Sequence, residues 1–143
     1  MAIDVTVTRT IGRSPREVMA YLADAAHDPE WIGGLIEVHP PDGPLAVGTQ
    51  VERVAGFMRR RIEYVLEVVA LEPERHIAMR SIRAPFPMEV TYEAAPADAG
   101  SLVSLRVQGG PGGLARMLHP LMARQMRGNL SGDLARLAAR LEQ

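Results

Sequence analysis

Two tyrosines and one histidine have the placement that acid–base chemistry, or hydrogen bonding to a ligand, requires. Tyr64 and Tyr92 fall on the apolar side of alternating segments, so each hydroxyl is expected to be buried and to need a partner. A carbonyl or phenol group of a ligand would supply one. His119 stands directly before Pro120, where the apolar pattern changes, a position suited to an acid or base at the mouth of a site. Tyr92 and His119 are therefore the candidate catalytic residues, and both tyrosines are candidate ligand-binding residues.

Three arginines, Arg9, Arg53 and Arg60, also lie on the apolar side of their segments. Burying a cation without a partner costs several kcal/mol, so an inward arginine needs a carboxylate, a water molecule or an anionic ligand group. The acidic residues of the nearest segments fall on the opposite side: Glu52, Glu63 and Glu67. The favoured interpretation is that each arginine lies near a strand end, with its stem on the core and its charge in water. If they face inward instead, Arg53 and Arg60 are candidate ligand-binding residues.

Several kinds of active site are excluded by residue type. The sequence has no cysteine and, since all 16 of its basic residues are arginine, no lysine. Disulfides, thiolate sites, Schiff-base chemistry and a P-loop lysine are therefore absent. No G-x-S-x-G motif is present, and Ser14 is better explained as a helix cap. The four histidines show no paired spacing typical of a metal site: His27, His39, His76 and His119. We expect no metal and no cofactor.

The size and charge of the chain further restrict the classes of function that the sequence allows. The chain has 143 residues, which predicts one domain over residues 1–143. Its net charge of -1 does not favour nucleic-acid binding, and Arg59-Arg60-Arg61 is interpreted as a solvated strand edge. Residues 1–11 alternate in polarity, unlike a signal peptide, and no apolar run is long enough to cross a membrane. We therefore expect a soluble, cytoplasmic protein that does not insert into membranes; its oligomeric state stays open.

The expected elements follow from local patterns. Residues 3–11 alternate apolar and β-branched polar side chains, as in a strand with one buried face. Ser14-Pro15-Arg16-Glu17 predicts a capped helix, and Asp28-Pro29-Glu30 predicts the start of a second, short one. Residues 35–108 read as strands joined by short turns, which makes them antiparallel.

The C-terminal segment is predicted to be helical and to pack on the concave face of the sheet. An apolar stripe recurs at helical spacing: Met122, Met126, Leu130, Leu134, Leu137 and Leu141. A second stripe, Leu114, Leu118 and Leu121, lies at another angle. Because Pro120 stands at the junction, we expect either a kinked helix or a short helix before a long one.

This α+β order resembles the helix-grip fold of the START/birch-pollen-allergen superfamily (SRPBCC), in particular its bacterial polyketide cyclase/dehydrase-like branch. The residues that carry the resemblance span the chain: Val7–Ile11, Ser14–Val18, His27–Trp31, Gly48-Thr49, Glu67–Arg75, Ile77–Ser81 and Asp133–Leu137. The resemblance implies a curved antiparallel sheet of about seven strands wrapped around a long C-terminal helix, with two short helices after the first strand. It transfers no catalytic residue.

The resemblance implies a cavity between sheet and helix. This cavity would bind a small hydrophobic ligand: a polyketide-like, lipid or aromatic molecule. Cyclisation or dehydration of such a molecule is the first candidate activity. Trp31 lies in the short second helix, where it either closes the pocket or anchors the helix. Methionines on elements expected to face the cavity add adaptable apolar surface: Met58, Met79, Met88, Met117, Met122 and Met126. The alternative function is a regulatory or co-chaperone-like module that binds another protein through its outer sheet face.

Overall fold

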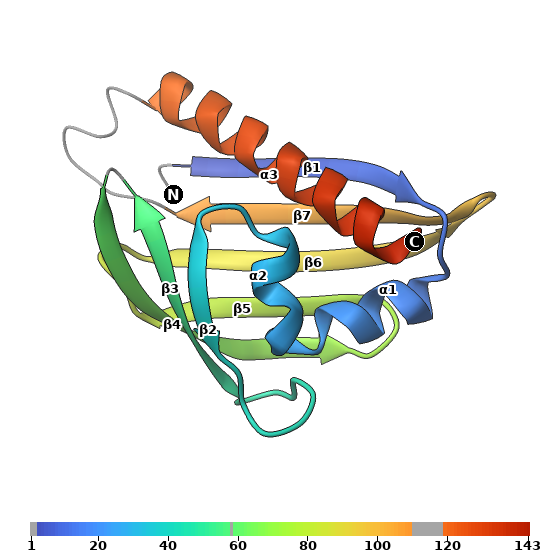
Figure 1. Cartoon of the computed structure of the whole chain (residues 1–143), viewed down its shortest axis with the longest axis horizontal. Helices are drawn as coiled ribbons and strands as arrows, with labels where there is room; N and C mark the ends of the chain where they lie inside the picture. The colour runs from blue at the N-terminus through green and yellow to red at the C-terminus, as the bar shows by residue number, and fades with distance from the viewer. Residues whose placement is uncertain (1–2, 58, 110–118) are drawn as a thin grey trace.

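The computed structural model describes residues 3–57, 59–109 and 119–143, without the side chains of Phe57 and His119 (Figure 1). Seven strands form one antiparallel sheet in the order β1-β7-β6-β5-β4-β3-β2, so that β1 and β2 are its two edges. The strands are β1 (Ile3–Ile11), β2 (Leu35–His39), β3 (Gln50–Phe57), β4 (Arg60–Glu72), β5 (His76–Arg83), β6 (Met88–Ala97) and β7 (Gly100–Gly109).

The two predicted helices, α1 (Pro15–Leu22) and α2 (Asp28–Trp31), follow β1, and a 3-10 helix that was not predicted, η1 (Ala25–His27), lies between them. The capping box that begins α1 is present: the Ser14 hydroxyl accepts from the Glu17 backbone N–H at 3.2 Å, and the Glu17 carboxylate accepts from the Ser14 backbone N–H at 3.4 Å. Helix α1 buries Val18, Met19 and Leu22 in the core. The local sequence therefore suffices to begin this helix, and burial of its apolar face keeps it on the sheet.

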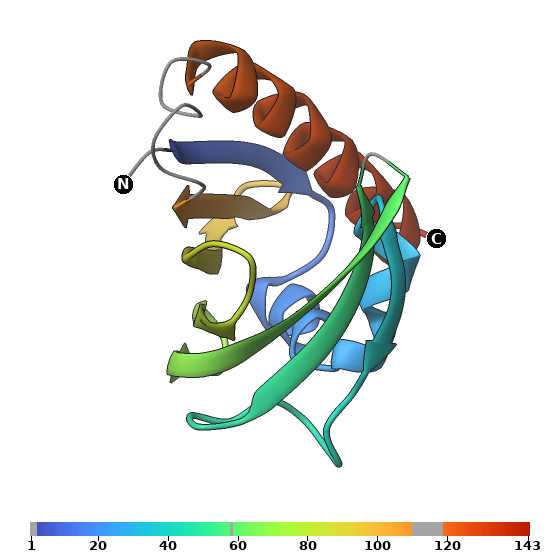
Figure 2. The same ribbon diagram turned by 90° about the vertical axis from the view of Figure 1, so that its left-hand side faces the viewer.

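The long helix α3 (His119–Leu141) closes the concave side of the sheet. It packs against the edge strand β1 and against α2, and Figure 2 shows it spanning from the β1 edge toward α2. Leu134 and Leu137 of the predicted stripe are fully buried, while Leu121 of the second stripe is 66% exposed. Leu114 and Leu118, and so the question of a kink before Pro120, lie outside the described residues.

This arrangement is the helix-grip fold expected from the sequence: a curled seven-stranded sheet, short helices after its first strand, and a long C-terminal helix. The alternation in β1 places Ile3, Val5 and Val7 in the core. One apolar cluster joins the inner faces of β1 and β3–β7 to α1, α2 and α3. The curl brings strands that are far apart in the sheet to face each other across this interior, which positions the site described next.

Candidate functional site

A buried cluster of polar side chains lies inside the curled sheet. The Arg53 guanidinium donates to one carboxylate oxygen of Asp28 from both Nε, at 3.1 Å, and Nη2, at 2.8 Å. The same Nη2 donates to the Tyr92 hydroxyl at 3.1 Å. Only 5% of Arg53, 2% of Asp28 and 3% of Tyr92 is exposed. We call these three residues the polar cluster.

Three separate elements position the polar cluster. Arg53 lies on β3, Tyr92 on β6, and Asp28 is the first residue of α2. Two strands separate β3 from β6 in the sheet, so their side chains meet only because the sheet curls. The favoured interpretation of Arg53, a charge that reaches water, is therefore wrong. Its partner, Asp28, is not among the acidic residues of the neighbouring strands, which were the ones considered in the sequence. Asp28 lies on a helix that packs inside the sheet.

Burial decides the ionisation of the polar cluster. It raises the pKa of the Asp28 carboxyl above its ordinary value, although the adjacent Arg53 cation acts in the opposite direction. Burial also raises the pKa of Tyr92 to about 12, again opposed by Arg53. For Arg53, burial favours loss of the proton, but Tyr92 and Asp28 outweigh it and raise the pKa. At neutral pH the interior thus holds a cation beside a phenol that keeps its proton.

Trp31 forms the wall next to the polar cluster. Its indole meets the Tyr92 ring edge to face, with ring centroids 5.5 Å apart and an interplanar angle of 70°. Only 2% of Trp31 is exposed, and its Nε1–H has no hydrogen-bond partner among the described residues. Burial of the ring and its contact with Tyr92 favour this position of Trp31.

Among the described residues, inward apolar side chains are more fully covered at one end of the interior than at the other. At the end where β1 finishes, the inward side chains of Ile11, Ala94, Val103 and Leu137 are buried. At the opposite end, where β7 finishes and β4 and β6 begin, Ile3 is buried but several inward apolar side chains are only partly buried; we call this the open end. They are Tyr64, Met88, Val107, Met122 and Met126.

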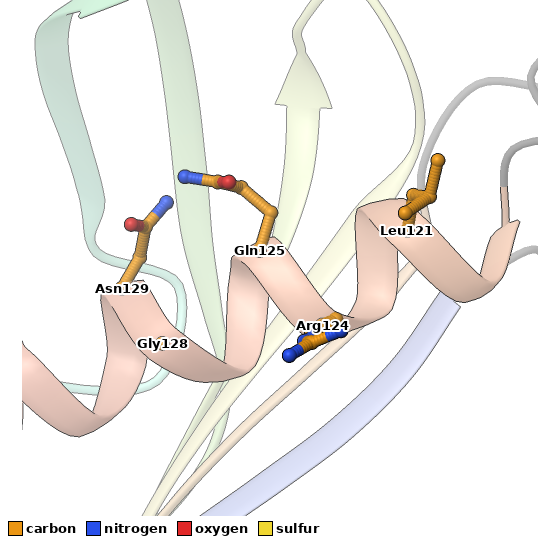
Figure 3. A pocket seen from close by; sticks show the side chains of 5 residues that line it. All are labelled: Leu121, Arg124, Gln125, Gly128 and Asn129. Carbon is orange, nitrogen blue, oxygen red and sulfur yellow. The ribbon is translucent and has the colours of Figure 1, made fainter.

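Two surface hollows accompany the site. The larger, of about 460 Å³, lies along the first half of α3 and is lined by Leu121, Arg124, Gln125, Gly128 and Asn129. Figure 3 shows Gln125 and Asn129 projecting from the same side of α3, and Arg124 from another. None of the polar cluster lines it. The smaller hollow, of about 170 Å³, includes Arg53 and Tyr64 among its lining residues on β2 to β5.

The structure brings some of the sequence candidates together and separates others. Trp31, Arg53 and Tyr92 meet in the buried interior, and Tyr64 is the register partner of Arg53 on β4. Met79 is buried in the core, 1% exposed, while Met88, Met122 and Met126 lie at the open end.

Two of the three arginines point to solvent. Arg9 and Arg60 are both exposed, as the favoured interpretation predicts. Arg60 therefore does not face the interior, and its selection as a ligand-binding candidate there is wrong. Strand phase gives only the side of a strand, and a long side chain at a strand end reaches water from either side. Arg59 and Arg61 are exposed too, in agreement with a solvated edge. The His119 side chain, Met58 and Met117 lie outside the described residues.

No group of three metal-binding side chains comes together in the described part of the chain. Within the same residues, no helix has the length and apolar character needed to cross a membrane.

The comparisons with known proteins agree with this architecture. The profile of the family described as "Polyketide cyclase / dehydrase and lipid transport" matches residues 2–142. The chain belongs to this family. No curated protein matches the chain.

Solved structures of other proteins share the fold of this chain at low sequence identity. Protein TTHA0849 from Thermus thermophilus is 19% identical, with a TM-score of 0.82 over 96% of each chain. The Zhui aromatase/cyclase from a Streptomyces species is 18% identical, with a TM-score of 0.78 over 97% of this chain and 93% of that one. Protein CV1439 from Chromobacterium violaceum is 18% identical, with a TM-score of 0.77 over 100% of this chain and 99% of that one. At these identities the likeness shows the fold alone.

Proposed function

We propose that this chain binds a small hydrophobic molecule carrying oxygen groups, polyketide-like, lipid or aromatic, in the interior between the sheet and α3. The observation that carries the proposal is the open end. Among the described residues, partly buried apolar side chains there face the concave side of the sheet. A ligand that covers them removes apolar surface from water, which favours binding.

The polar cluster gives this site its chemical preference. Tyr64 and Tyr92 lie on the inward side of their strands, and Arg53 holds a positive charge that is paired with the Asp28 carboxylate. A ligand carbonyl or phenol oxygen would accept a hydrogen bond from a tyrosine hydroxyl, and the Arg53 charge would favour negative charge that develops on that oxygen. The same arrangement would assist enolisation, and hence cyclisation or dehydration, of a polyketide-like substrate. We propose this as the activity, with Tyr92 and His119 as candidate proton donors or acceptors. The cytoplasm is the proposed location.

The alternative, a protein-interaction module, requires a contiguous apolar patch on the outer surface. The exposed large apolar side chains of the described residues stand on different elements: Ile36, Val47, Val69, Ile82, Leu102 and Leu121. Nothing in this distribution favours that alternative.

A binding screen tests the proposal. The probes are alizarin, naringenin and palmitate, and the measurements are thermal shift and dissociation constants from equilibrium dialysis. We expect at least one oxygen-bearing aromatic probe to stabilise the protein. Met126→Asp, which puts a charge among the partly buried apolar side chains, should weaken its binding, whereas Arg60→Ala at the exposed start of β4 should not. The absence of stabilisation by every probe would contradict the proposal.

Catalysis is tested separately from binding. Tyr92→Phe removes the hydroxyl within the polar cluster, and His119→Ala removes the second candidate group. Tyr21→Phe is the matched control, because Tyr21 lies on α1 and donates to Glu30 instead of joining the polar cluster. Turnover of a polyketide-like substrate should fall in Tyr92→Phe and stay unchanged in Tyr21→Phe. Unchanged turnover in both Tyr92→Phe and His119→Ala would clear these residues of a catalytic role.

A further inference from the structure

Two residues of α3 hold the end of α2 and the residues directly after it. The Asp133 carboxylate, on a side chain buried against this segment, accepts from the Gly33 backbone N–H at 2.9 Å. Arg136 donates from Nε to the Trp31 carbonyl oxygen at 3.0 Å and from Nη2 to the same carboxylate oxygen of Asp133. Together these contacts connect α3 to a segment about a hundred residues earlier in the chain.

Helix α2 depends on such contacts because it is too short to hold its own shape. It has four residues, and its last turn closes with the Ile32 N–H on the Asp28 carbonyl oxygen at 3.0 Å. An isolated turn of helix is not stable in water, so its orientation has to come from tertiary contacts. The approach of α3 is close: a Cβ on Gly33 would lie 2.5 Å from Arg136 Nη2.

The two ends of α2 carry two groups of the proposed binding site. Asp28 begins the helix and bonds to Arg53, and Trp31 ends it and packs on Tyr92. A rotation or shift of this single turn would change both contacts at once. The carbonyl that Arg136 holds belongs to Trp31 itself.

We propose that Asp133 and Arg136 are positioning residues, which act through α2 to set the orientation of Trp31 and Asp28 in the interior. They would thereby determine how tightly an aromatic ligand binds. The ligand part of this inference rests on the proposed function, whereas the orientation of Trp31 can be measured without any ligand.

The first experiment uses Trp31 as a probe, since it is the only tryptophan in the chain. The variants are Asp133→Ala, Arg136→Ala and Gly33→Ala; the added Cβ of the last would lie too close to Arg136 Nη2 and so displaces the guanidinium. Arg140→Ala is the control, as an exposed arginine on the last turn of the same helix. We expect the acrylamide quenching constant of Trp31 to rise several-fold and its near-UV circular dichroism to weaken in the three variants, while far-UV circular dichroism and the control stay unchanged.

A conservative variant separates positioning from general destabilisation. Asp133→Asn keeps an oxygen for the Gly33 N–H, so it should restore most of the Trp31 signal that Asp133→Ala loses. Arg136→Ala removes a half-exposed side chain and is expected to remain folded even if Asp133→Ala does not. Native quenching and dichroism of Trp31 in folded Arg136→Ala and Gly33→Ala would overturn the inference.

The second experiment measures binding of alizarin by equilibrium dialysis. We expect roughly tenfold weaker binding in Arg136→Ala, the scale on which one charge-assisted hydrogen bond changes an equilibrium. If the native protein does not bind alizarin while the Trp31 signals change as expected, the proposed ligand fails and the positioning role stands. If the native protein binds alizarin and Arg136→Ala binds it equally well with an unchanged Trp31 signal, the positioning role fails and the proposed function stands.

Discussion

Replacing Arg53 by methionine is the most direct test of the polar cluster. The substitution keeps an unbranched apolar stem but removes the guanidinium, and with it the hydrogen bonds of 2.8 and 3.1 Å to Asp28 and of 3.1 Å to Tyr92. Asp28 would stay buried without its cation. Breaking a buried ion pair from one side costs about 3–5 kcal/mol, so the free energy of unfolding of Arg53→Met should fall by that amount.

A double-mutant cycle separates the ion pair from its surroundings. Asp28→Leu should also cost about 3–5 kcal/mol, because it leaves the Arg53 cation buried beside a single phenol. The double variant Arg53→Met/Asp28→Leu leaves no unpaired charge and should recover much of this loss. We expect a coupling free energy of about 3 kcal/mol between the two positions. Arg60→Met, at an exposed arginine on the neighbouring strand, is the control and should change stability by less than about 0.5 kcal/mol.

Urea unfolding followed by far-UV circular dichroism gives these free energies by linear extrapolation. The pH dependence provides an internal check. Burial already raises the pKa of Asp28, and loss of Arg53 removes the opposing effect. In Arg53→Met the carboxyl therefore takes up a proton more readily, and the penalty should shrink as the pH falls toward the ordinary pKa of aspartate, about 4. A penalty below about 1 kcal/mol at neutral pH, or a coupling near zero, would refute the ion-pair argument.

Two further predictions concern single groups. Burial raises the pKa of Tyr92 to about 12, so at pH 11 the difference in tyrosinate absorbance between the native protein and Tyr92→Phe should correspond to about 10% of one tyrosine when folded, against about 90% in urea; the pKa of Tyr21 is raised as well. Since the unfolded chain loses these protons first, stability should fall as the pH rises from about 10 to about 12. Ser14→Ala removes the capping box of α1 and should cost about 1 kcal/mol in thermal unfolding, whereas Ser131→Ala on the exposed surface of α3 should cost little.

Most of the fold could be predicted from the sequence because its signals are local. The alternation of Ile3, Val5 and Val7 places β1 with one buried face, and the Ser14 capping box begins α1 where expected. Both depend on residues within a few positions of each other. The order of these elements was enough to indicate the helix-grip fold.

The candidate site could be predicted only in part. Strand phase correctly put Tyr92 inside and drew attention to Arg53, because it reports the side of a strand on which a residue lies. It does not indicate whether other elements cover a side chain at a given position along the strand. For that reason Arg9 and Arg60, in the same phase as Arg53, turned out to be exposed.

The sequence by itself determined the elements, their order and the apolar faces that pack together. Only the tertiary structure decided which polar groups meet. Asp28 and Arg53 are 25 residues apart, Arg53 and Tyr92 are 39 apart, and Gly33 and Asp133 are 100 apart. These pairs form because the sheet curls and α3 closes on α2, and no spacing rule along the chain encodes that geometry. The charge of Arg53 is tolerated inside for the same reason: its partner arrives from another element when the interior closes.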